Sequence, residues 1–118
     1  MNVDSKIFNL YILLIDTLIR ICAAFESTVD EEIEDYLEEL EGDYYTFFDK
    51  INLIPLQKAN LLTDIQFEMI VTLKKDISSI SPNLWNKVSI KKDLLWNKVV
   101  KEADDILNSL DVSRRKVE

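Results

Sequence analysis

Histidine is absent from this 118-residue chain, and glycine, proline and cysteine are scarce, with one Gly, two Pro and one Cys. The missing histidine removes the commonest general base, proton shuttle and metal ligand. No glycine-rich loop is present to cradle a phosphate group, and no Glu-x-x-His pair exists to build a di-iron centre. We therefore expect no catalytic activity, no metal ion and no cofactor.

The single cysteine, Cys22, cannot form an intramolecular disulfide, so nothing points to an oxidising compartment. It lies in an apolar run, where a small buried hydrophobic side chain is its expected role. A nucleophilic thiolate would need a neighbouring base or a positive site. We expect a structural Cys22 and a cytoplasmic protein.

Scarce glycine and proline also argue against a β-fold, because tight turns between strands use these residues. The chain is instead rich in Leu, Ile, Glu and Lys, which favour helices. We predict an all-α fold, a compact bundle of four to five helices joined by short connections that make neighbours antiparallel. Residues 1–112 form this single domain, and the basic tail 113–118 is expected to fray.

Capping residues and prolines place the helix boundaries. Thr28 and Glu31 have the form of a capping box, and Gly42 supplies a natural stop for the helix that follows. Thr63 and Gln66 form a second capping-box candidate. The predicted helices are 4–25, 28–41, a short aromatic one over 44–51, 63–79, one starting at Ser81-Pro82, and a last one with Leu95, Val99, Ala103, Ile106 and Leu110 on one face. Ile54, which precedes Pro55, is expected to be extended.

The apolar run from Ile7 to Phe25 resembles a membrane span or a signal peptide in composition. Asp16 and Arg20 interrupt it at i,i+4 spacing, where they can pair on one helix face. Two charges near the centre of a span would be expensive, and Asp4 with Lys6 gives no net positive charge before the run. We expect a core helix and no membrane association.

A five-residue motif, Leu-Trp-Asn-Lys-Val, occurs at 84–88 and again at 95–99. The offset of eleven residues is close to three helical turns, so both copies would face one side of an unbroken helix. Two copies are too few for a solenoid. The repeat is either a coincidence or a local duplication, and Ser89 could equally break it into two helices.

Acidity is concentrated in one segment. Residues 26–43 contain ten acidic residues and no basic one. Residues 1–59 hold 13 acids and 4 bases, whereas residues 60–118 hold 9 acids and 10 bases, within a net charge of −8. A charge of −8 repels phosphate, so we expect no binding to nucleic acid.

On a helical wheel the apolar residues 33, 36, 37 and 40 share one side, and the carboxylates fill the opposite arc. Glu31–Asp35, Glu34–Glu38 and Asp35–Glu39 are like-charge pairs at i,i+4, each costing a few tenths of a kcal/mol. This face is either a solvated surface, a docking surface for a basic partner or a divalent-ion site. Tyr44 and Tyr45 follow directly, and tyrosine is enriched at interface hot spots.

The order of features along residues 28–45 resembles part of the small acidic four-helix immunity proteins that neutralise nuclease colicins. The resemblance lies in a capped helix start, a run of acids and a Tyr-Tyr pair, and it covers about eighteen of the 118 residues. It implies a strategy, in which an acidic helix and tyrosines hold a cationic protein. The two Trp-containing repeats have no counterpart in it.

We predict an acidic binding protein that neutralises a basic protein partner, most concretely an immunity protein or antitoxin inhibiting a nuclease-type toxin. The alternatives are a helical adaptor or homo-oligomer in which Trp85 and Trp96 supply the contact, and a regulator that mimics DNA. The predicted partner-binding residues are Glu31, Glu34, Asp35, Glu38, Asp43, Tyr44 and Tyr45.

Overall fold

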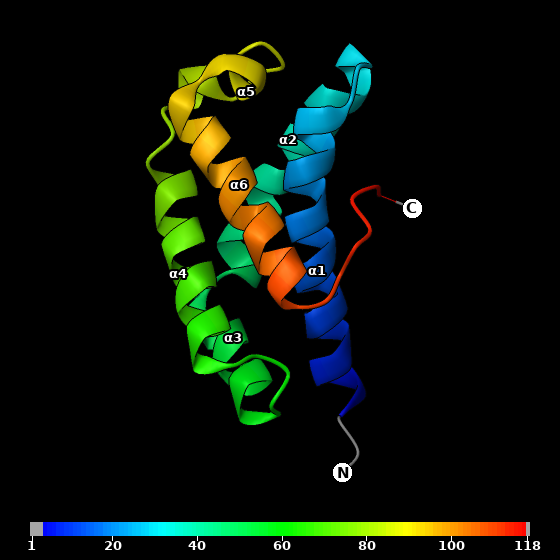
Figure 1. The fold of residues 1–118 in the computed structure, drawn as a ribbon, viewed down its shortest axis with the longest axis vertical. Helices are drawn as coiled ribbons and strands as arrows, with labels where there is room; N and C mark the ends of the chain where they lie inside the picture. The colour runs from blue at the N-terminus through cyan, green and yellow to red at the C-terminus, as the bar shows by residue number, and fades with distance from the viewer. Residues whose placement is uncertain (1–3, 118) are drawn as a thin grey trace.

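Apolar stripes on four long helices meet in one core in the computed structural model, which describes residues 4–117 (Figure 1). No strand occurs in that range, and the predicted all-α bundle is confirmed. The elements are α1 (Ser5–Glu26), α2 (Asp30–Phe47), α3 (Lys50–Lys58), α4 (Asp64–Ser78), the 3₁₀ turn η1 (Pro82–Leu84), α5 (Ser89–Lys92) and α6 (Leu94–Ser109). The described residues thus hold six α-helices where we expected four or five, because α3 and α5 are short separate pieces.

The two copies of the five-residue motif lie in different structures. The first spans η1 and the following coil, whereas the second is the start of α6. Trp96 is fully buried, and its indole Nε1–H donates a hydrogen bond to the Leu84 carbonyl oxygen at 2.8 Å. Trp85 is half-buried and lies edge-on to Trp96, with ring centroids 5.0 Å apart. Trp96 is therefore core, and it cannot supply the surface contact that the homo-oligomer alternative required of it.

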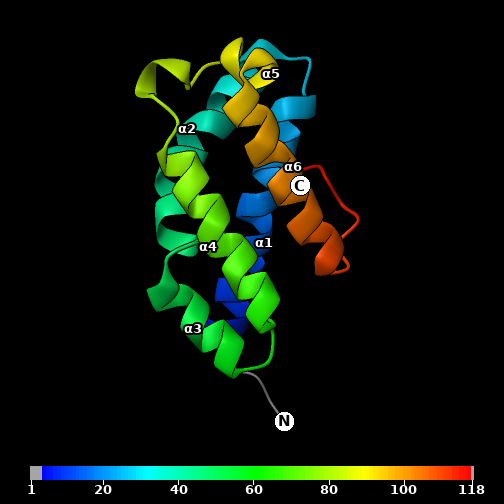
Figure 2. The ribbon, with the colours of Figure 1, turned by 60° about the vertical axis from the view of Figure 1, so that its left-hand side comes forward.

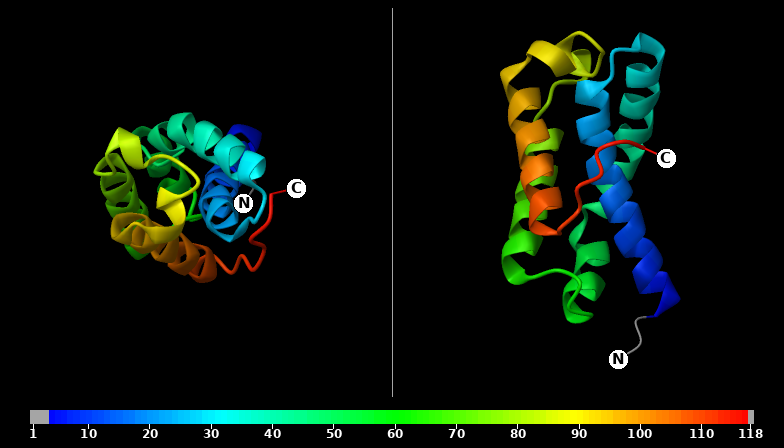
Figure 3. Two further views of the ribbon diagram at one scale, coloured as in Figure 1. Left: turned by 90° about the horizontal axis from the view of Figure 1, so that it is seen from above. Right: turned by 45° about the vertical axis from the view of Figure 1, so that its right-hand side comes forward.

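The helix α1 is buried along its second half only. Leu14, Leu18 and Ile21 are fully buried, whereas Phe8 in the first half is 51% exposed. By length and composition α1 could cross a membrane, and half of its apolar window lies inside the bundle. Figure 3 shows this helix with α2 along one side and the C-terminal segment beside it.

Arg20 of α1 pairs with α2 rather than with Asp16 as we expected. Its Nε lies 2.9 Å from Glu39 and its Nη1 lies 3.0 Å from Asp43. Asp16 instead pairs with Arg114, 3.3 Å away. The prediction of an intrahelical pair was wrong because neighbouring segments bring carboxylates and a guanidinium to these two side chains.

The helix α2 does not follow the predicted boundaries. Its N-cap is Val29, without a side-chain hydrogen bond, so Thr28 is not the cap. The helix passes through Gly42 to Phe47, so it includes residues 44–47 of the separate helix that we predicted over 44–51, and residues 50–51 begin α3. Buried Leu40 and half-buried Tyr44 flank Gly42 on the packed side, and this packing outweighs the weak helix propensity of glycine.

Pro55 lies inside α3, and Ile54 is helical rather than extended. The neighbouring Leu53 and Leu56 are both buried, so packing offsets the lost backbone hydrogen bond. Left-handed residues end α3 and α6: Asn60 has φ 63° and Asp111 has φ 60°. Asn and Asp tolerate this conformation, which explains how a chain with one glycine closes its helices.

The helix α4 starts as predicted, with a complete capping box. Gln66 N donates to the Thr63 hydroxyl at 3.1 Å, and the Gln66 side-chain oxygen accepts from Thr63 N at 2.9 Å. The predicted apolar stripe ran through residues 65, 69, 73 and 77, and Leu73 and Ile77 are buried as predicted. In the first half of the helix the buried positions are Phe67 and Ile70, whereas Ile65 is 74% exposed. The predicted start at Ser81-Pro82 is confirmed, although it opens only one 3₁₀ turn.

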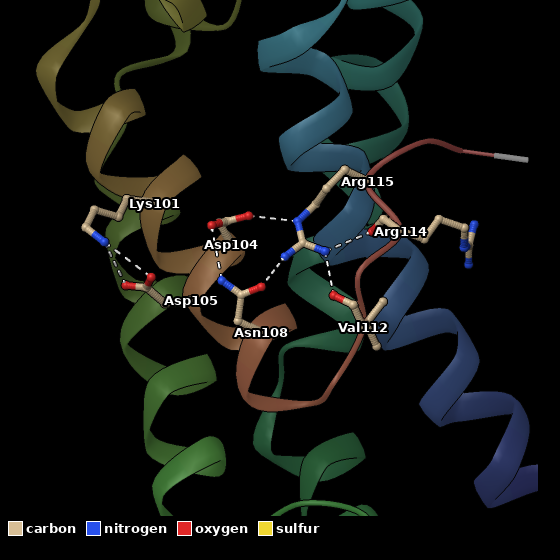
Figure 4. A network of polar contacts seen from close by, with 7 residues as sticks. All are labelled: Lys101, Asp104, Asp105, Asn108, Val112, Arg114 and Arg115. Atoms are coloured by element: carbon tan, nitrogen blue, oxygen red, sulfur yellow. Dashed lines mark hydrogen bonds and ion pairs between the residues drawn. The ribbon is translucent and has the colours of Figure 1, made fainter.

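The basic tail is docked rather than frayed over residues 113–117. Arg115 Nε lies 2.7 Å from Asp104, and its Nη2 donates to Asn108 at 2.7 Å (Figure 4). Val117 packs against the core. These contacts hold the tail between α1 and α6; residue 118 of the predicted tail lies outside the described residues.

Candidate functional site

The candidate site is the outward surface of α2, where Glu31, Glu34, Asp35 and Glu38 are all exposed. The opposite side of the helix is anchored by Ile33, Leu37 and Leu40, which are buried. At about 100° per residue, an apolar stripe on one side puts the intervening carboxylates in water. The four predicted acids therefore lie together, as the sequence indicated.

Basic residues compensate the edges of this surface. Arg20 holds Glu39 and Asp43 on one side. Lys87 holds Asp30 at 3.3 Å, and its backbone N–H donates to a Glu34 oxygen at 3.3 Å. These partners were not predicted, because they are distant from α2 along the chain and only the packed fold brings them to it.

The centre of the surface differs from its edges. Within residues 4–117, no ion pair joins Glu31, Asp35 or Glu38 to a basic side chain. The helix is thus fixed in place by its edges, while its central carboxylates face solvent. We define Glu31, Glu34, Asp35 and Glu38 as the acidic face.

The two tyrosines of the predicted site divide between core and surface. Tyr44 is half-buried and packs on Trp85, with ring centroids 5.9 Å apart. Tyr45 is 66% exposed, and the Lys74 Nζ lies 4.5 Å from the centre of its ring. Tyr44 is therefore a support for the site, whereas Tyr45 offers a contact surface.

The continuity of α2 brings Tyr45 to the acidic face. Tyr45 follows Glu38 by seven residues, which is close to two helical turns and places both on one side. A helix that stopped at Gly42 would have separated them. Asp43, the remaining predicted residue, is half-buried and bound by Arg20 rather than free for a partner.

Two other features bear on chemistry. Cys22 is buried, and burial, with a nearby Asp104, raises the pKa of its thiol to about 12, so the thiol stays protonated at neutral pH. Among the residues that the structure describes, no group of three or more His, Cys, Asp or Glu side chains is arranged to hold a metal ion.

Comparisons with protein-family models, with curated proteins and with solved structures found nothing that matches this chain.

Proposed function

We propose that this chain is an acidic binding protein that neutralises a basic protein partner. The observation that carries the proposal is the acidic face, a row of exposed carboxylates whose edges alone are compensated within the molecule. Like charges at i,i+4 cost helix stability. A partner that supplies Lys and Arg would relieve that cost on binding.

Arg20 and Lys87 support this interpretation because they act on the helix without covering its centre. They orient α2 before a partner arrives, so binding requires little rearrangement of the acidic helix. The uncompensated charges then attract a basic surface over a distance and raise the association rate. Tyr45 adds an exposed aromatic ring of the type found at interface hot spots.

The most concrete form of the proposal is an immunity protein or antitoxin that inhibits a nuclease-type toxin. A nuclease must carry a positive surface to hold the phosphate backbone of its substrate. Carboxylates on α2 would occupy that surface and exclude the nucleic acid. This form rests on the charge pattern and on the order of acids and tyrosines, and it places the protein in the cytoplasm.

The test uses the full chain as bait in a pull-down from the source cell, at low and at high salt. The matched variants are E31Q/D35N/E38Q on the acidic face and D64N/E68Q/D105N at exposed positions of α4 and α6, which change the net charge equally. We expect a basic partner that is retained at low salt and released at high salt. The α2 variant should lose it through slower association, and the other variant should retain it.

Equal association rates and equal salt slopes for the parent and the α2 variant would show that the acidic face is only a solvated surface. Capture of further copies of this chain alone would favour the homo-oligomer. Its contact would then involve exposed apolar residues such as Phe8 and Ile51, because Trp96 is buried. Capture of a DNA-binding protein that DNA displaces would favour a DNA mimic.

A further inference from the structure

A pocket of about 500 Å³ lies between α4 and α6, on helices that stand beside each other in Figure 2. Its apolar lining is formed by Ile65 and Met69 of α4 and Ile106 of α6. Ile65 is 74% exposed, Met69 is half-buried and Ile106 is fully buried. The bundle therefore leaves Ile65 and part of Met69 uncovered above the buried Ile106.

Polar contacts join the two helices on either side of the pocket. At one end Gln66 Nε2 donates to the Ser109 carbonyl and hydroxyl oxygens, each at 3.0 Å. At the other end Lys98 pairs with Asp76 at 3.3 Å. These contacts hold α4 and α6 together above and below the opening, so its walls are set by the fold.

The charged side chains that line the pocket are all acidic: Asp64, Glu68, Glu102 and Asp105. Asp105 is paired with Lys101 at 3.2 Å, and Asp64 accepts a hydrogen bond from Gln57 at 2.7 Å. Glu68 is exposed, and no ion pair joins it to a basic side chain among the described residues. Glu102 is half-buried and lies beside Asp76 and Lys98. The pocket thus combines an apolar wall with the unpaired carboxylate of Glu68 and the half-buried carboxyl group of Glu102.

Its size favours a small molecule over a helix from another protein. The volume falls within the range of sites for small ligands. The apolar side chains that are not buried, Ile65 and Met69, lie four residues apart, which at about 1.5 Å per residue is roughly one helical turn. An amphipathic partner helix would need apolar contacts over at least two turns.

We propose that this pocket binds an organic cation with an apolar body, with a long-chain primary amine as the type. The alkyl chain would lie on Ile65 and Met69, above the buried Ile106, and the ammonium group would donate to the carboxylates of Glu68 and Glu102. Burial of the chain supplies affinity, and the acidic lining selects a cation over an alcohol or an acid. The site lies on α4 and α6, so it is independent of the acidic face of α2.

The test is calorimetric titration of the full chain at about pH 8.5, above the Glu102 pKa of about 7, so that Glu102 is ionised. The ligands are octylamine, octanol and octanoate, each below its aggregation concentration. We expect octylamine to bind and octanoate not to bind. Octanol should bind at least about tenfold more weakly, since it lacks the charge-assisted hydrogen bonds. Tetramethylammonium, which carries the charge without a long chain, should not bind.

Variants locate the binding site. E68Q/E102Q should weaken octylamine binding by about tenfold or more, whereas E31Q/E38Q, with the same change in net charge, should leave it unaltered. Ile65→Ser should weaken it several-fold without unfolding the chain, because Ile65 is exposed. Equal affinity of the parent for octylamine and octanol would overturn the proposal, as would equal loss in both charge variants. Filling of the pocket by a second copy, seen as a dimer that E68Q/E102Q disrupts, would also overturn it.

Discussion

Two tryptophans in identical five-residue motifs differ in their burial and in their contacts. Trp96 lies in the core with its indole N–H bound to the Leu84 carbonyl, whereas Trp85 is half-buried against Tyr44. No local signal distinguishes the two copies of the motif. Their roles follow from which copy lies within α6, and that depends on the rest of the bundle.

Replacing Trp96 with Phe should therefore be costly. The smaller ring leaves a cavity, and the Leu84 carbonyl loses its donor, so we expect a loss of about 2–4 kcal/mol in the free energy of unfolding. Trp85→Phe is the matched control and should cost about 1 kcal/mol or less, because the side chain is partly in solvent. Urea unfolding followed by circular dichroism measures both. Equal losses would show that the burial and the hydrogen bond of Trp96 add no stability beyond what the half-buried Trp85 contributes.

Glu102 should make stability depend on pH near neutrality. Burial, and then Asp76, raise the pKa of its carboxyl from 4.5 to about 7, with Lys98 lowering it and Asp105 raising it further. The Glu102 Oε1 and Asp76 Oδ2 atoms are buried and accept no hydrogen bond, although Lys98 Nζ lies 3.3 Å from Asp76 Oδ2. A proton on Glu102 would supply a donor between the two carboxyl groups.

The folded chain therefore holds a proton that the unfolded chain releases between pH 4.5 and about 7. Stability from this group is present below that window and is lost as pH rises through it. Glu102→Gln cannot titrate, so the variant should lose less stability than the parent between these pH values. Urea midpoints at both ends of the window test this, and parallel pH profiles would contradict it.

At the scale of helices, local signals succeeded where capping side chains decide the boundary. The Thr63–Gln66 box set the start of α4, and Asp4 accepts a hydrogen bond from Lys6 N at the start of α1. They failed where burial decides. Gly42 and Pro55 both lie inside helices, because packed side chains on either side hold the backbone in place: Leu40 and Tyr44 around Gly42, and Leu53 and Leu56 around Pro55.

Replacing Gly42 with Ala tests whether α2 continues through Gly42 or ends there. Gly42 lies in the helix interior, and a Cβ there would meet nothing within 4 Å. Alanine should therefore stabilise the chain by about 0.5–1 kcal/mol, through helix propensity and a less flexible unfolded state. If the helix ended here with a left-handed glycine, alanine would destabilise it instead. The sign of the change in urea unfolding decides.

The candidate site was predictable only where local sequence patterns determine it. Helical spacing alone placed Glu31, Glu34, Asp35 and Glu38 on one exposed face, and the structure agrees. The continuity that adds Tyr45 needed the packing around Gly42. The basic partners at the edges of α2 and the pocket between α4 and α6 needed the tertiary fold, since their residues are far apart in sequence.

At the scale of the whole molecule, the charge of −8 is distributed unevenly over the surface. Interhelical ion pairs such as Arg20–Glu39 and Lys98–Asp76 use basic residues to join elements. The central acids of α2 receive none of this compensation within the described residues. Of the electrostatic energies in this molecule, the repulsion among these central acids should therefore be the one that salt weakens most.

Neutralising the centre of α2 should stabilise the free protein in a salt-dependent way. The variant D35N/E38Q removes three like-charge i,i+4 contacts and should gain roughly 1 kcal/mol in the free energy of unfolding at low salt. The gain should shrink at about 1 M salt, where the screening length is about 3 Å. Glu31→Gln is the control: Glu31 lies in the first turn of α2, where the helix dipole favours an acid, so its removal should give no such gain. Urea unfolding at both salt concentrations measures the effect. If the gain persists at high salt, its cause is helix propensity rather than charge. If there is no gain at either salt concentration, the acidic face carries no electrostatic cost that a basic partner could relieve.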